Sequence, residues 1–137
     1  MARQTDQYLR ETLTYLGTAM ATSQHAWSPN TDVFETCSSL IVRMELAGIR
    51  HEDLEITLTD RLLVVRGHRR EPCRQGRCTF RQMEIDYGEF QRRIVIPSSV
   101  DASRVRAQLD HGFLHIELPK AERSDPRAIT VIIEQLG

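Results

Sequence analysis

Apolar and polar residues alternate with a period of two from Thr31 to Pro119, and this alternation constrains the fold more than any other feature of the chain. A period of two is typical of β-strands that have one buried and one solvent-facing side. The clearest runs extend from Leu40 to Leu46 and from Leu54 to Leu58. Short strands at spacings of roughly ten residues, without a long helical period among them, predict an antiparallel, immunoglobulin-like β-sandwich rather than a parallel sheet.

Further strands are expected in the second half of the alternating region. Leu62 to Val65 is a continuous apolar run, which indicates a central strand covered on both faces. Phe90 to Ile96 predicts another strand. Val105 to Leu109 and Phe113 to Leu118 are separated by Asp110, His111 and Gly112, residues that tolerate the positive φ angles of a tight hairpin turn.

Composition and charge exclude several classes of protein. The 137 residues are 40% hydrophobic and 27% charged, as expected for one globular domain, and the net charge of −1 gives no overall field to attract nucleic acid or an anionic membrane. The first 30 residues contain no apolar run long enough for a signal peptide or membrane span, so we expect a cytosolic location. Cys37, Cys73 and Cys78 include no CxxC spacing, and we expect three reduced thiols.

The two ends of the chain differ from its middle. We expect an N-terminal arm over residues 1–28, a β-domain over 29–120 and a C-terminal extension over 121–137. Leu9, Leu13, Leu16 and Met20 recur at helical spacing and predict an amphipathic helix in the arm. The extension begins as a polar tether and ends in apolar residues from Ile129 to Ile133.

One segment carries a family signature. Ala107-Gln108-Leu109-Asp110-His111-Gly112-Phe113-Leu114 is similar to the A-x-x-x-n-G-v-L motif of the α-crystallin domain, and Leu46-Ala47-Gly48, Tyr87-Gly88-Glu89-Phe90 and Leu118-Pro119-Lys120 follow the same family pattern. The chain therefore resembles the small heat-shock proteins over about Trp27 to Val131, with Ala47 and Phe113 as departures. In the signature turn of Ala107, Gly112 and Leu114, a side chain at Gly112 would strain the backbone, and Leu114 is expected to point into the sandwich.

The resemblance implies a function that involves no catalysed reaction. It predicts an ATP-independent holdase chaperone that binds partly unfolded client proteins and forms a homo-oligomer of dimers, with no catalytic residues, no cofactor and no metal. The histidines and carboxylates do not suggest a reaction centre either, because pairs such as Asp110 and His111 or His115 and Glu117 lie in turns or along strands without a specific catalytic pattern.

The C-terminal Ile129-Thr130-Val131 resembles the family's I-x-I/V motif, which docks in a groove on another subunit. The groove expected here is formed by two strands and comprises Leu54, Ile56, Leu58, Val105, Ala107 and Leu109. Two alternatives stay open at this point. The tail adds a strand to its own sheet, or it docks in a second register that uses Val131 and Ile133.

The segment His68 to Met83 has the length of the family loop that exchanges a strand between the subunits of a dimer. The exchange strand is expected at Cys78, Thr79, Phe80, Arg81 and Gln82, and the resemblance also implies that Arg92 pairs with a carboxylate across the dimer. The simpler alternatives are a surface loop and a solvated arginine.

The arm supplies the expected client-binding residues. Its apolar side chains lie outside the predicted sandwich and would cover exposed hydrophobic surface on a client; they are Tyr8, Leu9, Leu13, Leu16, Met20 and Trp27. The alternative is an arm that serves assembly only.

The sequence is compatible with two other functions. The first is a sandwich adaptor that docks one defined partner. The second is a nucleic-acid binder that uses the six arginines of the loop 66–81, which contains Phe80 as its single aromatic residue and so offers little base stacking. His68, Cys73 and Cys78 match no established metal site, and redox crosslinking between loops is a further alternative for the cysteines.

Overall fold

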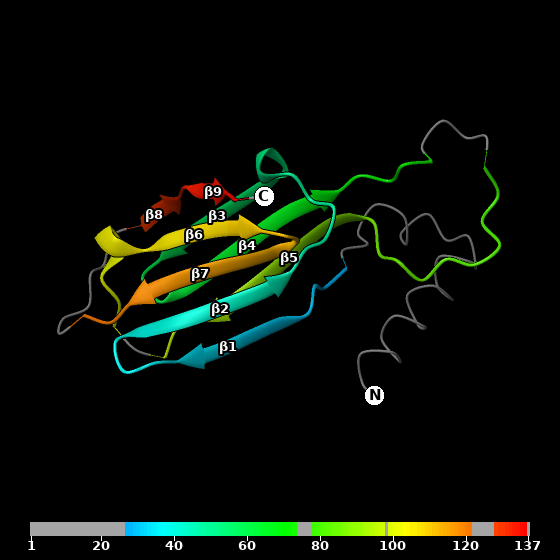
Figure 1. The fold of residues 1–137 in the computed structure, drawn as a ribbon. Helices are drawn as coiled ribbons and strands as arrows, with labels where there is room; N and C mark the ends of the chain where they lie inside the picture. Colours follow the sequence, from blue (N-terminus) through cyan, green and yellow to red (C-terminus); the bar gives the residue numbers. More distant parts are fainter. Residues whose placement is uncertain (1–26, 74–77, 98, 122–127, 137) are drawn as a thin grey trace.

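The computed structural model describes residues 27–73, 78–97, 99–121 and 128–136, and within these ranges the chain forms a two-layered β-sandwich (Figure 1). One sheet has five strands in the order β1-β2-β7-β6-β9, and the other has four in the order β5-β4-β3-β8. The bounds are β1 Thr31–Glu35, β2 Ser39–Glu45, β3 Leu54–Thr59, β4 Leu62–Arg69, β5 Gly88–Val95, β6 Arg106–Asp110, β7 Phe113–Pro119, β8 Ala128–Val131 and β9 Ile133–Gln135. The predicted fold class is confirmed.

The apolar and polar residues that alternate in the sequence lie on the buried and exposed faces of the strands. On β2, Leu40, Val42 and Met44 are buried and Arg43 and Glu45 are exposed. All strand pairs are antiparallel except the pairing of β9 with β6. The apolar run of β4 lies between β5 and β3, and its residues Leu63, Val64 and Val65 are all buried, as expected for a central strand.

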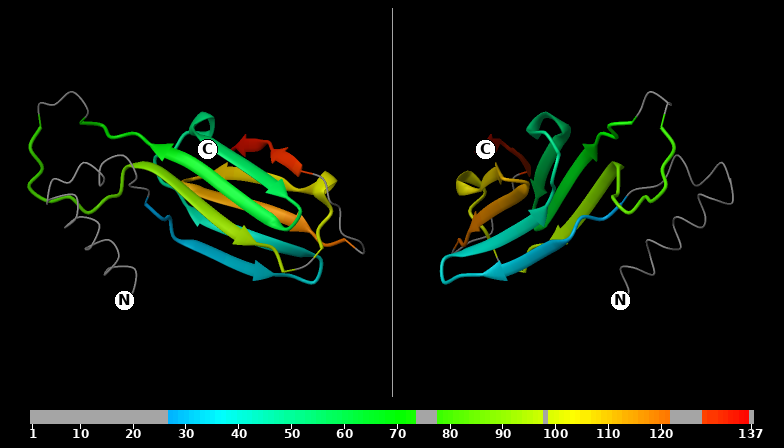
Figure 2. Two further views of the ribbon diagram at one scale, coloured as in Figure 1. Left: turned by 180° about the vertical axis from the view of Figure 1, so that it is seen from behind. Right: turned by 45° about the vertical axis from the view of Figure 1, so that its right-hand side comes forward.

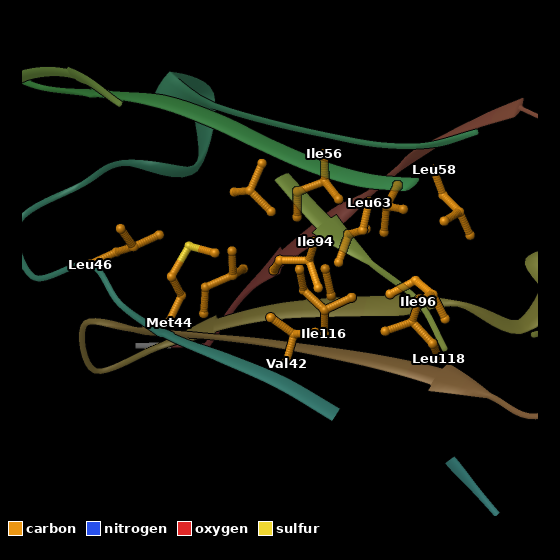
Figure 3. Packing of buried hydrophobic residues seen from close by; sticks show 14 of the residues in the cluster. Val42, Met44, Leu46, Ile56, Leu58, Leu63, Ile94, Ile96, Ile116 and Leu118 are labelled. Atoms are coloured by element: carbon orange, nitrogen blue, oxygen red, sulfur yellow. The ribbon is translucent and has the colours of Figure 1, made fainter. Parts of the chain in front are cut away.

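The core lies between the two sheets and is assembled from both (Figure 3). Ile56, Leu58 and Leu63 point inward from one sheet, and Val42 and Ile116 point toward them from the other. These side chains are almost completely removed from solvent. Each contributes about 1.5 to 3 kcal/mol of hydrophobic stabilisation relative to an exposed side chain.

The hairpin between β6 and β7 turns on two residues with positive φ. His111 has φ 50° and Gly112 has φ 83°, the combination that a two-residue turn needs to match the twist of its strands. The Gly112 carbonyl accepts a hydrogen bond from the Leu46 amide at 2.7 Å. A Cβ on Gly112 would lie 3.2 Å from the Cα of Ala47, so both the φ angle and the close approach favour glycine.

Trp27 does not belong to the arm, and its assignment to the client-binding residues is wrong. Its side chain is only 6% exposed and lies in the core. The indole Nε1 donates a hydrogen bond to the Gly88 carbonyl at 3.0 Å, and the ring packs edge-on against Phe90 with centroids 5.1 Å apart. Residues 1–26 of the predicted arm lie outside the described residues.

The prediction of three reduced thiols is also wrong. Cys73 and Cys78 form a disulfide, and Cys37 is free and exposed. The physical reason is proximity, because the two Cα atoms lie 6.2 Å apart, within the range that a disulfide bridges. The bond lies within one loop rather than between loops.

Candidate assembly site

The C-terminal segment lies along the edge of the sandwich and contacts both sheets (Figure 2). Strand β8 pairs antiparallel with β3 in one sheet, and β9 pairs parallel with β6 in the other. Ile132 separates the two strands and is 88% exposed. The segment, called the tail from here on and comprising residues 128–136, therefore bridges the two layers at the side where β3 and β6 lie next to each other.

Alternate tail residues face the sandwich. Ile129 is registered with Leu58 and Val131 with Ile56, both on β3, whereas Ile133 is registered with Ala107 on β6. Val131 is only 6% exposed, and Ile129 and Ile133 are partly buried against the core. The two registers left open by the sequence are thus parts of one contact, in which Val131 is the central residue.

The groove residues expected from the sequence lie together beneath the tail. Ile56, Leu58, Ala107 and Leu109 are buried, and Leu54 and Val105 are partly buried against the same cluster; all six come from β3, from β6 or from the residue just before β6. In the single chain the occupant of this groove is the chain's own tail, which is the alternative of an added strand in its own sheet. Docking on another subunit stays a prediction.

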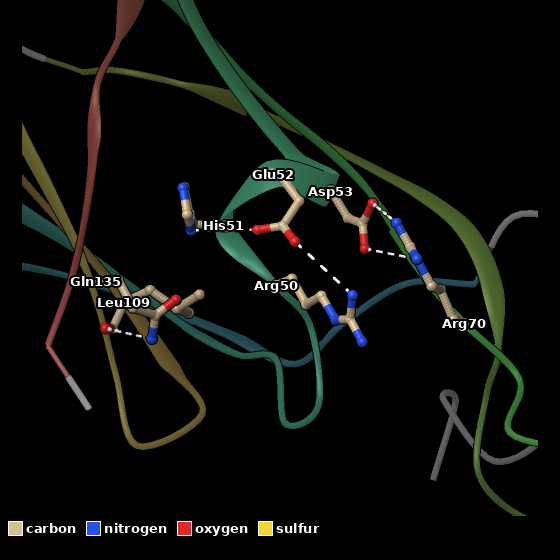
Figure 4. Close-up of polar contacts among 7 residues, drawn as sticks. All are labelled: Arg50, His51, Glu52, Asp53, Arg70, Leu109 and Gln135. Atoms are coloured by element: carbon tan, nitrogen blue, oxygen red, sulfur yellow. Dashed lines mark hydrogen bonds and ion pairs between the residues drawn. The ribbon is translucent and has the colours of Figure 1, made fainter.

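Polar contacts fasten the far end of the tail (Figure 4). The Leu136 amide donates to the Leu109 carbonyl at 2.8 Å, and the Gln135 side-chain amide donates to the same carbonyl at 3.3 Å. The Gln108 amide also reaches the Glu134 carboxylate at 3.4 Å. These bonds add to the backbone pairing of β8 with β3 and of β9 with β6, and to the apolar contacts of Ile129, Val131 and Ile133.

A bidentate ion pair lies beside the groove (Figure 4). Arg70 Nε and one of its terminal nitrogens each lie 3.0 Å from an oxygen of Asp53, in the turn His51–Asp53 that leads into β3. The hydrogen bond from Arg70 lowers the pKa of Asp53, and the same bond raises the pKa of Arg70. Because Arg70 directly follows β4, the pair fixes the start of the following loop next to the groove strand.

The described parts of the loop between β4 and β5, residues 70–73 and 78–87, extend away from the end of the sandwich (Figure 2). They include the expected exchange strand, Cys78 to Gln82, which is exposed and forms no strand within the single chain. Phe80, Met83 and Ile85 are 45%, 50% and 60% exposed. The loop thus presents apolar side chains on an extended backbone.

Arg69 and Trp27 fix the base of this loop. The Arg69 guanidinium lies 4.2 Å above the Trp27 ring and donates from Nη1 to the Asp86 carbonyl at 2.8 Å. Burial lowers the pKa of Arg69, because the charged form is partly desolvated. The contact joins the last residue of β4 to the end of the loop. Sequence reasoning missed it, and the single tryptophan of the chain was the available signal.

Arg92 lies on β5, on the side of the sandwich away from the tail. Its Nη1 donates to the Ser28 hydroxyl at 2.8 Å, which ties β5 to the segment that leads into β1. Its Nε is buried and has no hydrogen-bond partner within the described part of the chain. The bond to Ser28 therefore holds Arg92 in place at this edge of the sheet.

The remaining alternatives gain little from the geometry. Of the loop arginines considered for nucleic-acid binding, Arg69 and Arg70 are engaged within the domain. Among residues 27–73, 78–97, 99–121 and 128–136, no cluster of His, Cys, Asp or Glu is arranged to hold a metal ion. In the same ranges, no helix has the length and apolar character to cross a membrane.

Comparison with known proteins decides the family. The sequence profile of the Hsp20/alpha crystallin family matches residues 32–134, which is most of the chain. This chain belongs to that family. Its small heat-shock protein relatives include small heat shock protein C2 of Rickettsia felis, 33% identical over 103 residues that cover 75% of this chain and 67% of the relative.

Two further relatives support the same assignment. Spore protein SP21 of Stigmatella aurantiaca is 35% identical over 106 residues, which cover 77% of this chain and 63% of that protein. A small heat-shock protein from Xylella fastidiosa superimposes with a TM-score of 0.65 at 32% identity, covering 78% of this chain and 98% of that one. The Hsp20 chain thus spans about two thirds of the length of the curated relatives named here. These likenesses support a chaperone function of the small heat-shock protein type.

Proposed function

We propose that this Hsp20 chain is an ATP-independent holdase that assembles with copies of itself and binds partly unfolded proteins through apolar surface. No catalytic step and no cofactor are part of this function. The observation that carries the proposal is the docked tail, a short apolar segment held in a groove by strand pairing with β3 and β6 and by side-chain burial. Such a segment is a reversible connector, and a groove that accepts it from one chain fits the same segment from a neighbour.

The strength of the tail contact supports reversible assembly. Val131, which is almost fully buried, contributes about 1.5 to 3 kcal/mol, and the partly buried Ile129 and Ile133 contribute less, before the cost of ordering the tail is subtracted. Residues 121–127 separate the tail from the end of the sandwich, and an extended chain from Lys120 to Ala128 spans up to about 26 Å. The tail therefore has the length to leave its own groove and reach a neighbouring one. Several such contacts on one particle would act with avidity.

Strand exchange is the second contact in the proposal. Strand β1 is the outer strand of its sheet, and its backbone edge is a template for an added strand. The exposed segment Cys78 to Gln82 from a second subunit would pair along that edge and bring Phe80 with it. The guanidinium of Arg92, which is only partly buried, is suited to a carboxylate of the partner.

Client binding is proposed for the arm and the exposed loop together. Tyr8, Leu9, Leu13, Leu16 and Met20 lie outside the described residues, and their role stays a prediction. Phe80, Met83 and Ile85 add exposed apolar surface that the sequence did not assign to clients. The Xylella relative, described as having a distinct high-order structure, supports self-assembly in this family. A cytosolic location also stays a prediction.

The tail proposal is tested by particle size. We expect light scattering after size exclusion to give a particle much larger than a dimer for the native chain and a dimer for the variant with Ile129→Ala and Val131→Ala. Ile132→Ala is the matched control, because this neighbouring side chain is exposed, and it should leave the size unchanged. A double variant with the native size would reject the tail as the connector.

The holdase proposal is tested by aggregation. The pure chain should suppress the heat-induced light scattering of unrelated enzymes at near-equal subunit ratio without ATP. Bovine serum albumin at the same concentration is the control for nonspecific protection. A native-sized particle that leaves client aggregation unchanged would contradict the holdase function and leave the assembly proposal standing.

A further inference from the structure

The disulfide between Cys73 and Cys78 lies between the Arg70–Asp53 pair and the proposed exchange strand. The Arg70–Asp53 pair holds the chain three residues before it, and Cys78 is the first residue of the proposed exchange strand. The two cysteines lie on either side of residues 74–77, and Cys78 is exposed. The covalent bond and the exchange strand therefore share a residue.

The bond limits how far the loop extends. Five residue steps of extended chain, from residue 73 to residue 78, span about 17 Å, whereas the disulfide holds the two Cα atoms 6.2 Å apart. Both ends of the loop are fixed to the domain, by Arg70 with Asp53 and by Arg69 with the Asp86 carbonyl. A loop that is closed at its base and shortened in its middle has less reach toward the β1 edge of a second subunit.

The sequence next to the two cysteines favours thiol–disulfide exchange. In the sequence, Cys73 is followed by Arg74 and Cys78 is preceded by Arg77. A neighbouring positive charge favours the thiolate, which is the reactive form of cysteine. Exposed disulfides are also the labile and regulatory ones, in contrast to buried structural bonds.

We infer that Cys73 and Cys78 are a reversible redox site that withholds the exchange strand when oxidised and releases it when reduced. The inference rests on the proposed strand exchange. In the oxidising step the two thiols lose two electrons and two protons to a small-molecule disulfide such as oxidised glutathione, which leaves as two thiols after a mixed-disulfide intermediate. A dithiol reductant reverses the step and restores both cysteines.

The chemistry is tested by alkylation of the full-length chain carrying Cys37→Ser, equilibrated in glutathione buffers from reducing to oxidising. Peptide mass spectrometry should show Cys73 and Cys78 losing alkylation together at one midpoint, with the bond within a single chain. Two cysteines that stay alkylated in every buffer, or that crosslink only between chains, would overturn the inference.

The control of assembly is tested on the full-length chain with Ile129→Ala and Val131→Ala, in which the tail contact is removed. Sedimentation should give a dimer dissociation constant about tenfold higher for the oxidised chain than for the reduced one, the loss expected if one or two backbone hydrogen bonds of the exchanged strand fail to form. Adding Cys73→Ser and Cys78→Ser should keep the tighter value under both conditions, and Cys37→Ser alone should not remove the difference.

Two outcomes separate the redox inference from the proposed function. Dimers of equal affinity in both redox states would overturn the inference and leave strand exchange intact. A chain that stays monomeric in both states, although alkylation shows the bond forming and breaking, would contradict strand exchange itself and with it the assembly role of the site.

Discussion

Gly67, on β4, leaves the space in which the Phe90 ring packs. A Cβ at this residue would lie 2.5 Å from Cε1 of Phe90 and 2.9 Å from Cδ2 of Leu54. The Phe90 ring fills that space and in turn supports Trp27. The requirement here is close approach rather than backbone conformation.

We predict that Gly67→Ala lowers the free energy of unfolding by about 1 to 3 kcal/mol, because the added methyl group displaces the Phe90 ring. Chemical denaturation of the variant and of Glu55→Ala, an exposed change on the neighbouring strand, measures the effect. A Gly67→Ala variant as stable as the native chain would mean that Phe90 moves freely at this site.

The Asp53–Arg70 pair gives a second residue-scale prediction. The pKa of Asp53 is lowered in the folded chain by the hydrogen bond from Arg70. The pair's stabilisation is therefore complete above the ordinary aspartate value of about 3.9 and is lost as the pH falls through the lower folded value. Its size is modest because Arg70 is exposed.

We expect Asp53→Asn to lower the melting temperature at about pH 7 and the difference from the native chain to shrink below about pH 4. Thermal unfolding across this range measures it, with Glu52→Gln as the neighbouring control. A difference that does not depend on pH would show that the carboxylate charge of Asp53 does not contribute.

At the scale of elements, Trp27 marks where the β-domain begins. Its amide donates to the Glu89 carbonyl at 3.2 Å and forms a bridge to Phe90, so the backbone joins β5 four residues before β1 starts. The β-domain therefore begins at Trp27, two residues before the expected start at residue 29.

Because Trp27 is the single tryptophan, its fluorescence reports on this junction directly. We predict blue-shifted emission in the native chain and a red shift that coincides with global unfolding. Trp27→Phe should abolish the signal and destabilise the fold, since the indole hydrogen bond to Gly88 is lost, by about 1 kcal/mol. Red-shifted emission from the native chain would show that Trp27 is exposed to solvent, as expected for a residue of the N-terminal arm.

For the whole molecule, one groove serves two possible occupants. The chain's own tail holds the groove at the high effective concentration that a short linker gives, so a second tail binds only when the first leaves. Assembly would then depend on the competition between docking within a chain and docking between chains.

We predict that a labelled peptide of residues 127–137 binds the full-length variant with Ile129→Ala and Val131→Ala at least about tenfold more tightly than it binds the native chain, whose own tail competes. Fluorescence anisotropy measures both affinities. The same peptide with alanine at Ile129 and Val131 is the control. Equal affinity for the two chains would show that the native tail does not occupy its groove in solution.

The chain's local patterns predicted its local structure. Alternation from Leu40 to Leu46 determined the buried face of β2, and His111 with Gly112 determined the hairpin, because strand faces and tight turns depend on residues close in sequence. The I-x-V tail and the groove strands were likewise found by spacing and resemblance, and the structure brings their residues together.

Only the tertiary structure decided which partners meet across long separations. The sequence did not show that Trp27 packs against Phe90 or that Arg69 bonds to the Asp86 carbonyl. It also did not show that the Cα atoms of Cys73 and Cys78 lie 6.2 Å apart. It also left open whether Val131 lies in its own groove. Each of these contacts depends on the path of the chain between its members, and side-chain periodicity records which face is buried but not what covers it.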